Sequence, residues 1–486
     1  MPPRPAEMTP SERRRGMRRR TSPAARVAAR VAALLAAGAL AGASLPAQAR
    51  KGPPIIRDAE IEQLLKEYAQ PILRVAGLTR QNIQVVIVND SSFNAFVADG
   101  RRIFINAGAL LDADTPNQVI GVLAHEAGHI AGGHLARLHE RLASASTQSA
   151  VAMVIGLGAL VAASRSGGGN YSALGQGGMA ALAGPNAAVQ NSVFAYMRAQ
   201  EEQADRAGVR FLTASGQSAK GMYVTFKRMA NQGLYQARNI NPYLQTHPMP
   251  GERVAALEGM AKASPYWNAK DPPELQARHD LMGAKLFGFL ASPAAVARRF
   301  PPSNNSLQAQ YARAISVVRF GQPQAAQARV EALIHAQPQN PYFHELKGQM
   351  LLESGHPAEA IAPLREAVAL APNPALIQIM LGQALVASHD HAHLDEAVKV
   401  LQSALTRDPE SADAFTQLAM AYGQKNDLAH ADLASAEAAW ARDDLKTASE
   451  IAARAKTRFP IGSPGWVRAD DLSNYKPPPR QPSAKW

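Results

Sequence analysis

Residues 122–130 of the chain read VLAHEAGHI, and this stretch is the most informative part of the sequence. Its leading apolar residues and good helix formers predict an α-helix, on which residues four apart lie on the same face. His125 and His129 can therefore bind one zinc ion together, and Glu126 lies beside that ion, where it can take a proton from a water molecule. The pattern predicts a zinc site with a general base.

A further ligand is expected on a later helix, where residues 197–206 read MRAQEEQADR. Glu201 and Asp205 are four residues apart and share a helical face, so Glu201 can bind the zinc ion while Asp205 orients the imidazole of a ligand histidine. Glu202 points about 100° away from that face and is predicted to face solvent.

Two nearby histidines compete with Glu201 for the role of third ligand. A form of the motif that ends in a third histidine would need it at position 135, where Leu135 stands, although Gly132 fits the glycine of that form. On a continuing helix, His134 would lie about half a turn away from His125. His134 and His139 are therefore predicted to face solvent, and Glu201 is the preferred ligand.

Composition and charge exclude several other classes of protein. The 486 residues are 47% apolar, which predicts two or three ordered domains, and the absence of cysteine means that a metal site must use His, Asp or Glu. The net charge is +12, but residues 1–49 contribute +7, from nine Arg against Glu7 and Glu12. The remaining chain is only +5, which argues against a nucleic-acid-binding protein.

Residues 1–49 read as a secretory signal peptide. A basic stretch ends at Arg30, an apolar run covers 31–37, and Ala47-Gln48-Ala49 is a cleavage site of the small-x-small type. We expect cleavage after Ala49 and an exported protein. No run of about 20 apolar residues follows, so we expect no membrane-spanning helix.

The segment 141–190 is rich in Ala, Gly and Ser and is predicted to be a mobile lid or loop region. Within it, residues 150–163 are all apolar or small, too few to cross a bilayer and too apolar for a free surface helix. They are predicted to form a lid over the active cleft, an element that contacts the membrane surface, or a core helix.

The C-terminal half repeats with a period of 34 residues. After residues 389–393 the offset grows to 37, as a three-residue loop insertion would produce. Small residues recur at one pair of positions and proline at a third: Ala314, Gly348 and Gly382; Ala326, Ala360 and Ala397; Pro338, Pro372 and Pro409. Small side chains let paired helices approach closely and proline ends the second helix, so the pattern resembles the tetratricopeptide repeat (TPR).

The predicted fold is mainly α with a small β-sheet: an α+β zincin-type protease domain followed by an α-solenoid of TPR helix pairs. The predicted divisions are the signal peptide (1–49), the protease domain (50–270), a linker (271–305), the TPR domain (306–460) and a Pro-rich tail (461–486).

The pair HEAGH and EEQAD resembles the HExxH…ExxAD pair of peptidase family M48, the group of HtpX and the CAAX prenyl proteases. The order of signal peptide, protease domain and TPRs resembles the periplasmic BepA-like proteases of that family. The resemblance implies that His125, His129 and Glu201 bind one Zn²⁺ per chain, and that Glu126 is the general base and acid.

Two further segments fit this family. His247, in Thr246-His247-Pro248, and Arg253 resemble its His-Pro…Arg element. The resemblance implies that His247 either approaches zinc as a fourth, latency-imposing ligand or assists the tetrahedral intermediate, while Arg253 stabilises an oxyanion or pairs with a carboxylate. Residues 93–105 read as a hairpin with an Asp-Gly turn, whose strand lines the active cleft in this family and can take an extended substrate as an added strand.

The predicted function is therefore that of a periplasmic zinc metalloendopeptidase. By family resemblance, it degrades misfolded proteins and aids outer-membrane β-barrel assembly and quality control, with unfolded or misassembled polypeptides as substrates and the β-barrel assembly machinery as a partner of the TPRs. The alternative is a TPR chaperone or scaffold with a latent or structural zinc site.

Overall fold

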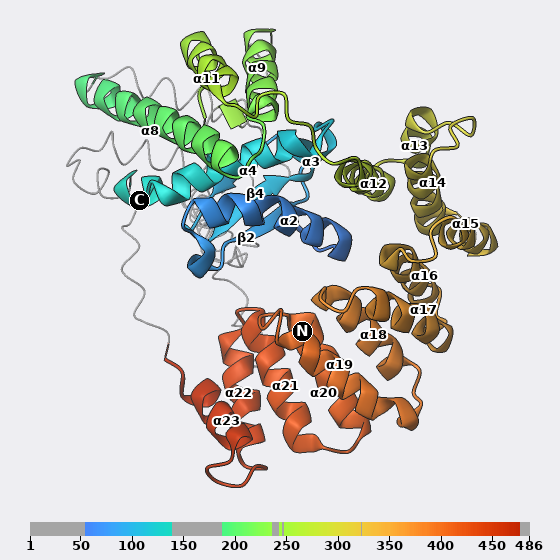
Figure 1. Ribbon diagram of the computed structural model, residues 1–486. Coiled ribbons are helices and arrows are strands. Elements are labelled where there is room, and N and C mark those ends of the chain that lie inside the picture. The colour runs from blue at the N-terminus through green and yellow to red at the C-terminus, as the bar shows by residue number, and fades with distance from the viewer. Residues whose placement is uncertain (1–53, 139–186, 236–242, 245–246, 322, 477–486) are drawn as a thin grey trace, which may run out of the picture. The chain divides into compact units, whose positions relative to one another are not determined.

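The computed structural model describes residues 54–138, 187–235, 243–244, 247–321 and 323–476, and Pro53–Trp486 forms one compact unit (Figure 1). The predicted signal peptide, residues 141–186 of the predicted lid region with its apolar run 150–163, His139 and Thr246 lie outside the described residues, while residues 187–190 belong to a helix. None of the described helices is both long and apolar enough to cross a bilayer.

The N-terminal half contains a four-stranded sheet of order β1-β2-β4-β3. Its strands are β1 (Ile55–Ile56), β2 (Gln84–Val88), β3 (Ala95–Val97) and β4 (Arg102–Asn106). β2 pairs with β4 in parallel, while β1 and β3 run antiparallel to their neighbours. β3 is therefore an edge strand, with its outer side unpaired among the described strands.

The predicted hairpin over residues 93–105 is confirmed by the pairing of β3 with β4. Phe96 stands opposite Phe104, and the two rings stack with their centroids 5.2 Å apart. In the turn, the Asp99 carboxylate accepts hydrogen bonds from the backbone N–H groups of Arg101 and Arg102. Gly100 takes a φ of +74° there, a conformation that favours glycine.

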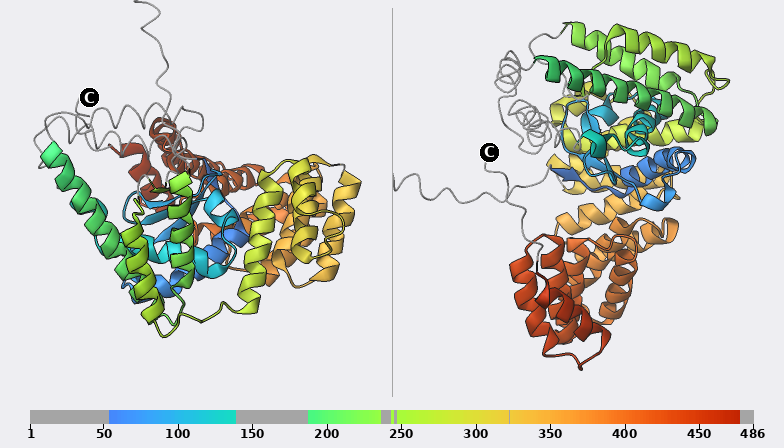
Figure 2. Two further views of the ribbon diagram at one scale, coloured as in Figure 1. Left: turned by 90° about the horizontal axis from the view of Figure 1, so that it is seen from above. Right: turned by 90° about the vertical axis from the view of Figure 1, so that its left-hand side faces the viewer.

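The described helices pack against one face of this sheet, and α4 lies between the sheet and helices α8 and α9 (Figures 1 and 2). The helices of this half are α2 (Ala59–Val75), the 3₁₀ helix η2 (Thr79–Gln81), α3 (Ala107–Leu111), α4 (Pro116–Ala131), α8 (Ala187–Ala214), α9 (Lys220–Tyr235) and α11 (Gly251–Ala263). One apolar core joins α2, the sheet, α4, α8 and α9, so α4 is the central helix of the domain.

The C-terminal half is a series of paired helices, which confirms the predicted TPR organisation. The helices are α14 (Leu307–Phe320), α15 (Pro323–Ala336), α16 (Pro341–Glu353), α17 (Pro357–Leu370), α18 (Ala375–Ala387), α19 (Leu394–Leu405), α20 (Ala412–Gln424), α21 (Leu428–Ala441) and α22 (Leu445–Lys456). The short helix η3 (His391–His393) occupies the predicted three-residue insertion between α18 and α19.

The repeated small residues lie where helices of one pair meet. A β-carbon at Gly348 would come within 2.3 Å of Leu364, and one at Gly382 within 2.5 Å of Leu401. The repeated prolines follow the ends of α15, α17 and α19. The 34-residue period therefore encodes the close approach of two helices and the end of the second.

Two of the predicted divisions contain helices that the sequence analysis did not anticipate. The predicted linker 271–305 contains α12 (Pro273–Leu290) and α13 (Pro293–Arg299), and the predicted Pro-rich tail contains α23 (Pro464–Asn474). In all three helices a proline stands in the first turn, where its missing N–H group costs no helical hydrogen bond. Proline in these segments starts helices instead of preventing them.

A cluster of buried charges joins α12, the N-terminus of α2 and the first TPR helices. Lys285 of α12 is 4% exposed, and its Nζ lies 2.8 Å from Asp58 Oδ2 and 3.3 Å from Glu60 Oε2. Glu345 Oε2 of α16 is 3.6 Å from the same Nζ, and the Tyr311 hydroxyl of α14 donates to Glu60. One cation thus faces three carboxylates, which we call the junction cluster.

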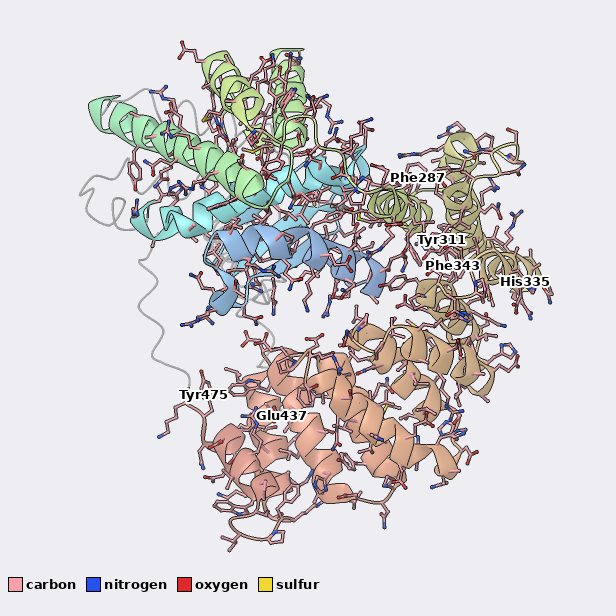
Figure 3. All side chains as sticks on the ribbon, viewed as in Figure 1. Phe287, Tyr311, His335, Phe343, Glu437 and Tyr475 are labelled. Atoms are coloured by element: carbon pink, nitrogen blue, oxygen red, sulfur yellow. The ribbon has the colours of Figure 1, made fainter. Side chains whose placement is uncertain are left out.

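The TPR core continues directly beside this cluster. The rings of Tyr311 and Phe343 meet edge to face, 5.0 Å apart, and both side chains are fully buried (Figure 3). The junction cluster is therefore enclosed by packed apolar side chains, which keeps water away from its charges.

The junction cluster predicts a pH-dependent stability. Burial raises the pKa of Glu345 to about 7, with Asp58 and Glu60 adding to the effect and Lys285 opposing it. Because the pKa of Glu345 is higher in the folded protein than in the unfolded chain, protonated Glu345 stabilises the fold. This contribution is complete below about pH 4.5 and is lost as pH rises through 7. Between pH 5 and 8, the wild-type free energy of unfolding should fall by about 1–3 kcal/mol relative to Glu345→Gln, as measured by urea titration. Parallel curves for the two proteins would contradict this expectation.

Candidate active site and metal centre

Helix α4 carries both histidines of the HEAGH motif, and α8 crosses it at Gly128. A β-carbon at Gly128 would lie 2.8 Å from the carbonyl oxygen of Ala204, so the two helices approach as closely as their backbones allow. This crossing places Glu201 and Asp205 of α8 against His125 and His129. The glycine of HEAGH and the alanine of EEQAD are therefore packing residues that bring the two motifs together.

Four side chains gather their ligand atoms within 4.8 Å of one another: His125, His129, Glu201 and His247. His125 Nε2 lies 3.1 Å from His129 Nε2 and 3.4 Å from Glu201 Oε2. His247 Nδ1 is 3.0 Å from Glu201 Oε2 and 3.4 Å from His125 Nε2. We call these four residues the ligand group. His125, Glu201 and His247 are each less than a tenth exposed.

The spacing of the ligand group fits a tetrahedral metal ion. Ligands at 2.0–2.2 Å from zinc in tetrahedral geometry stand about 3.3–3.6 Å from one another. The distances between neighbouring ligand atoms here are 3.0–3.4 Å. Imidazole nitrogens with one carboxylate are also the donor set that zinc prefers in enzymes.

Asp205 lies behind the ligand group and holds it in place. Its Oδ1 is 3.0 Å from His125 Nδ1, and Arg253 donates to both of its oxygens, at 2.5 and 2.8 Å. Arg253 also lies 2.9 Å from Glu201 Oε2 and donates to the carbonyl of Pro248. Of its two predicted roles, the geometry favours pairing with carboxylates.

The electrostatics of the ligand group follow from these contacts. Burial would lower the pKa of His125, but hydrogen bonds with Asp205 and Glu201 outweigh it and raise that pKa to about 9. Burial would raise the pKa of Glu201, but the imidazoles of His247 and His129 hold it well below its usual value. Burial lowers the pKa of His129 well below normal. The group therefore concentrates negative charge at Glu201 and Asp205, which favours a cation.

Glu126 follows His125 on α4 and is almost fully buried. Burial raises the pKa of its carboxyl group, with His247 and His125 acting in the opposite direction. Its Oε1 is 3.7 Å from His247 Nε2. Glu126 thus sits beside the ligand group, outside the set of atoms that would bind the ion.

His247 enters the site from the segment that precedes α11. Its ring stacks on that of Tyr243, with centroids 4.5 Å apart, and Tyr243 in turn meets Phe93 near the β3–β4 hairpin. His247 is 6% exposed. Aromatic packing therefore holds this histidine inside the ligand group.

The prediction that His134 faces solvent was wrong, since this residue is only 3% exposed. Helix α4 ends at Ala131 and the chain turns through Gly133, whose φ is +62°, so the helical extrapolation fails at this point. His134 folds back until its Nδ1 is 3.0 Å from His129 Nδ1. The Gly132-Gly133 pair was the sequence signal that could have revealed this turn. Glu202 faces solvent as predicted.

Comparison with known families now assigns the two halves. Residues 56–261 match the model of peptidase family M48, and residues 311–374 match that of the tetratricopeptide repeat. Residues 56–261 form an M48 peptidase domain. The chain therefore joins an M48 metallopeptidase domain to C-terminal TPRs, and the M48 family implies a divalent metal ion, which the ligand group is suited to hold.

The chain is also similar to several individual proteins. The chain is 25% identical over 432 residues to the beta-barrel assembly-enhancing protease of Escherichia coli K12, covering 87% of this chain and 84% of the relative. The metalloprotease LoiP of the same organism is 28% identical over 210 residues, covering 42% of this chain and 75% of LoiP. A solved TPR protein with an unusual peptide-binding site, YrrB, aligns with 46% of this chain and 96% of its own at 18% identity and a TM-score of 0.27.

Proposed function

We propose that this protein is a periplasmic zinc metalloendopeptidase that degrades misfolded polypeptides and aids the assembly and quality control of outer-membrane β-barrel proteins. The observation that carries the proposal is the buried ligand group with Glu126 beside it. The name of the E. coli relative, a beta-barrel assembly-enhancing protease aligned over 87% of this chain, supports the proposed substrate class.

Zinc is the proposed metal, and His125, His129 and Glu201 would hold it. When bound, zinc polarises the scissile carbonyl group and lowers the pKa of the attacking water. Glu126 takes a proton from that water and then delivers it to the leaving amine. Asp205 keeps the proton of His125 on Nδ1, so that Nε2 is free for the metal. Arg253 contacts the carboxylates of Asp205 and Glu201 and holds both in place.

The substrate is proposed to bind as an extended strand along β3. β3 is an edge strand whose neighbour β4 leads into α3 and then α4, and backbone pairing with an edge strand requires no particular side chains. Such binding suits unfolded chains. The TPRs would hold a substrate or a component of the β-barrel assembly machinery, because stacked helix pairs create an extended binding surface.

The alternative function is that of a TPR chaperone or scaffold with a latent or structural zinc site. His247 Nδ1 belongs to the ligand group, and a fourth protein ligand displaces the water that a catalytic zinc needs. Glu126 favours the enzyme, because a structural site has no use for a general base. We propose an enzyme that His247 keeps latent.

Replacement of His247 by alanine is expected to increase cleavage. We would incubate the chain from residue 50 onwards with an unfolded β-barrel polypeptide and measure the initial rate for wild type and His247→Ala. If the contact between His247 and the metal favours the latent state by about 1.4 kcal/mol, losing it makes the active state about tenfold more populated and raises the cleavage rate by the same factor. The zinc content should remain near one per chain, because three ligands remain.

Other outcomes of this experiment separate the alternatives. A lower rate in His247→Ala at unchanged zinc content would indicate that His247 assists the tetrahedral intermediate instead of restraining the site. Zinc binding without cleavage by either protein would favour the TPR scaffold. No zinc bound by the wild type would refute the proposed metal centre.

A further inference from the structure

The two ligand histidines of α4 have different partners on their inner nitrogens. His125 Nδ1 faces the carboxylate of Asp205 at 3.0 Å, whereas His129 Nδ1 faces another imidazole, His134 Nδ1, at 3.0 Å. The rings of His129 and His134 stand almost perpendicular, with centroids 5.0 Å apart. An edge-to-face pair at this distance between nitrogens is a hydrogen bond and not a stacking contact.

The number of protons on the two rings fixes the direction of this hydrogen bond. Two imidazole nitrogens 3.0 Å apart share one proton, so one donates and the other accepts. His129 Nε2 belongs to the ligand group and must offer a lone pair to the metal, which leaves the proton of neutral His129 on Nδ1. His134 Nδ1 must then accept, and its own proton must reside on Nε2.

We propose that His134 is a positioning residue of the metal centre: its unprotonated Nδ1 accepts the Nδ1–H of His129 and so orients Nε2 of that ligand toward the metal. This inference rests on the proposed zinc site. His134 performs for His129 the task that Asp205 performs for His125, but as a neutral acceptor that adds no negative charge to the site.

The surroundings of His134 hold its ring in this position. Gln200 of α8 donates to the backbone carbonyl of His134, which ties the turn after α4 to the helix that carries Glu201. A β-carbon at residue 132 would lie 2.3 Å from His134 Nε2, so Gly132 leaves the space that the ring occupies.

The test compares zinc affinity in the purified chain, measured by competition with a chelator, for wild type, His134→Leu and His134→Asn. Leucine fills the space without offering an acceptor, so the affinity of the His134→Leu protein for zinc is expected to fall about 10–100-fold. Asparagine can place an amide oxygen near the former Nδ1, and its affinity should stay within a few-fold of wild type. Equal affinities for wild type and leucine, or equal losses in both variants, would overturn the inference.

His279→Leu is the matched control. His279 is also 3% exposed and lies in the same unit, but its nitrogens contact the Tyr68 hydroxyl and the Ala113 carbonyl instead of a metal ligand. This variant should lose stability without losing zinc affinity. A loss as large as that of His134→Leu would show that general destabilisation explains the effect, and would overturn the inference.

Nitrogen-15 NMR of the histidines in the zinc-loaded wild type gives a direct readout. The inference requires a neutral His134 with its proton on Nε2 and a His129 with its proton on Nδ1. A His134 protonated on Nδ1 would overturn it. A wild type that binds no zinc would refute the proposed function first, whereas a wild type that binds and cleaves beside an unaffected His134→Leu would refute this inference alone.

Discussion

Glu126→Gln is expected to lower the cleavage rate of an unfolded β-barrel polypeptide by about 10²–10⁴-fold, the usual contribution of a general acid–base residue. Glutamine keeps the size of the side chain but cannot take the proton of the attacking water. Glu126 is outside the ligand group, so zinc content should remain at one per chain. Rates measured in the His247→Ala background would show the effect free of latency.

Variants on α8 are the controls for this prediction. Glu201→Ala removes a ligand and should lose both zinc and cleavage, as should His125→Ala. Glu202→Gln changes the adjacent glutamate, whose side chain is 54% exposed and pairs with Arg206, so it should keep both. Cleavage that survives in Glu126→Gln, or full zinc occupancy in Glu201→Ala and His125→Ala, would contradict the assignment of roles.

Most of the metal centre could be predicted from the sequence, because its parts are short and periodic. HEAGH and EEQAD each place two functional residues one helical turn apart, and helical geometry alone shows which of them share a face. The TPR half was predictable for a similar reason, since the 34-residue spacing of small residues repeats one helix-to-helix contact. The point at which α4 and α8 cross was not derivable from the spacing within either motif.

Features that depend on where helices begin and end, or on contacts between residues far apart in the sequence, could not be predicted from short motifs. His134 was misplaced because a helix was extrapolated through Gly132-Gly133, and α12 and α23 were not anticipated in the segments predicted to be a linker and a Pro-rich tail. The junction cluster carries no sequence signal at all. Asp58, Lys285 and Glu345 are each ordinary charged residues until folding brings them within 4 Å.

A large effect on stability is expected when the junction cluster loses its cation. Lys285→Met is expected to lower the free energy of unfolding by about 3–5 kcal/mol at pH 8, because it leaves buried carboxylates without their cation. Methionine retains much of the apolar stem of lysine, so the loss reports mainly on charge. Lys262→Met is the control: its side chain is 57% exposed and pairs with Glu258 on the surface of α11, where such a pair contributes at most about 1 kcal/mol.

The pH dependence of Lys285→Met distinguishes charge from packing. Burial raises the pKa of both Glu60 and Glu345, so these groups can take up protons in the folded protein when the lysine is absent. The deficit of Lys285→Met relative to wild type should therefore shrink when urea titrations are repeated at pH 5. Adding Glu345→Gln to Lys285→Met should recover part of the loss at pH 8, since one buried charge is removed. A deficit that is equal at pH 5 and pH 8 would mean that the lysine stem stabilises the junction by packing, and that its charge contributes little.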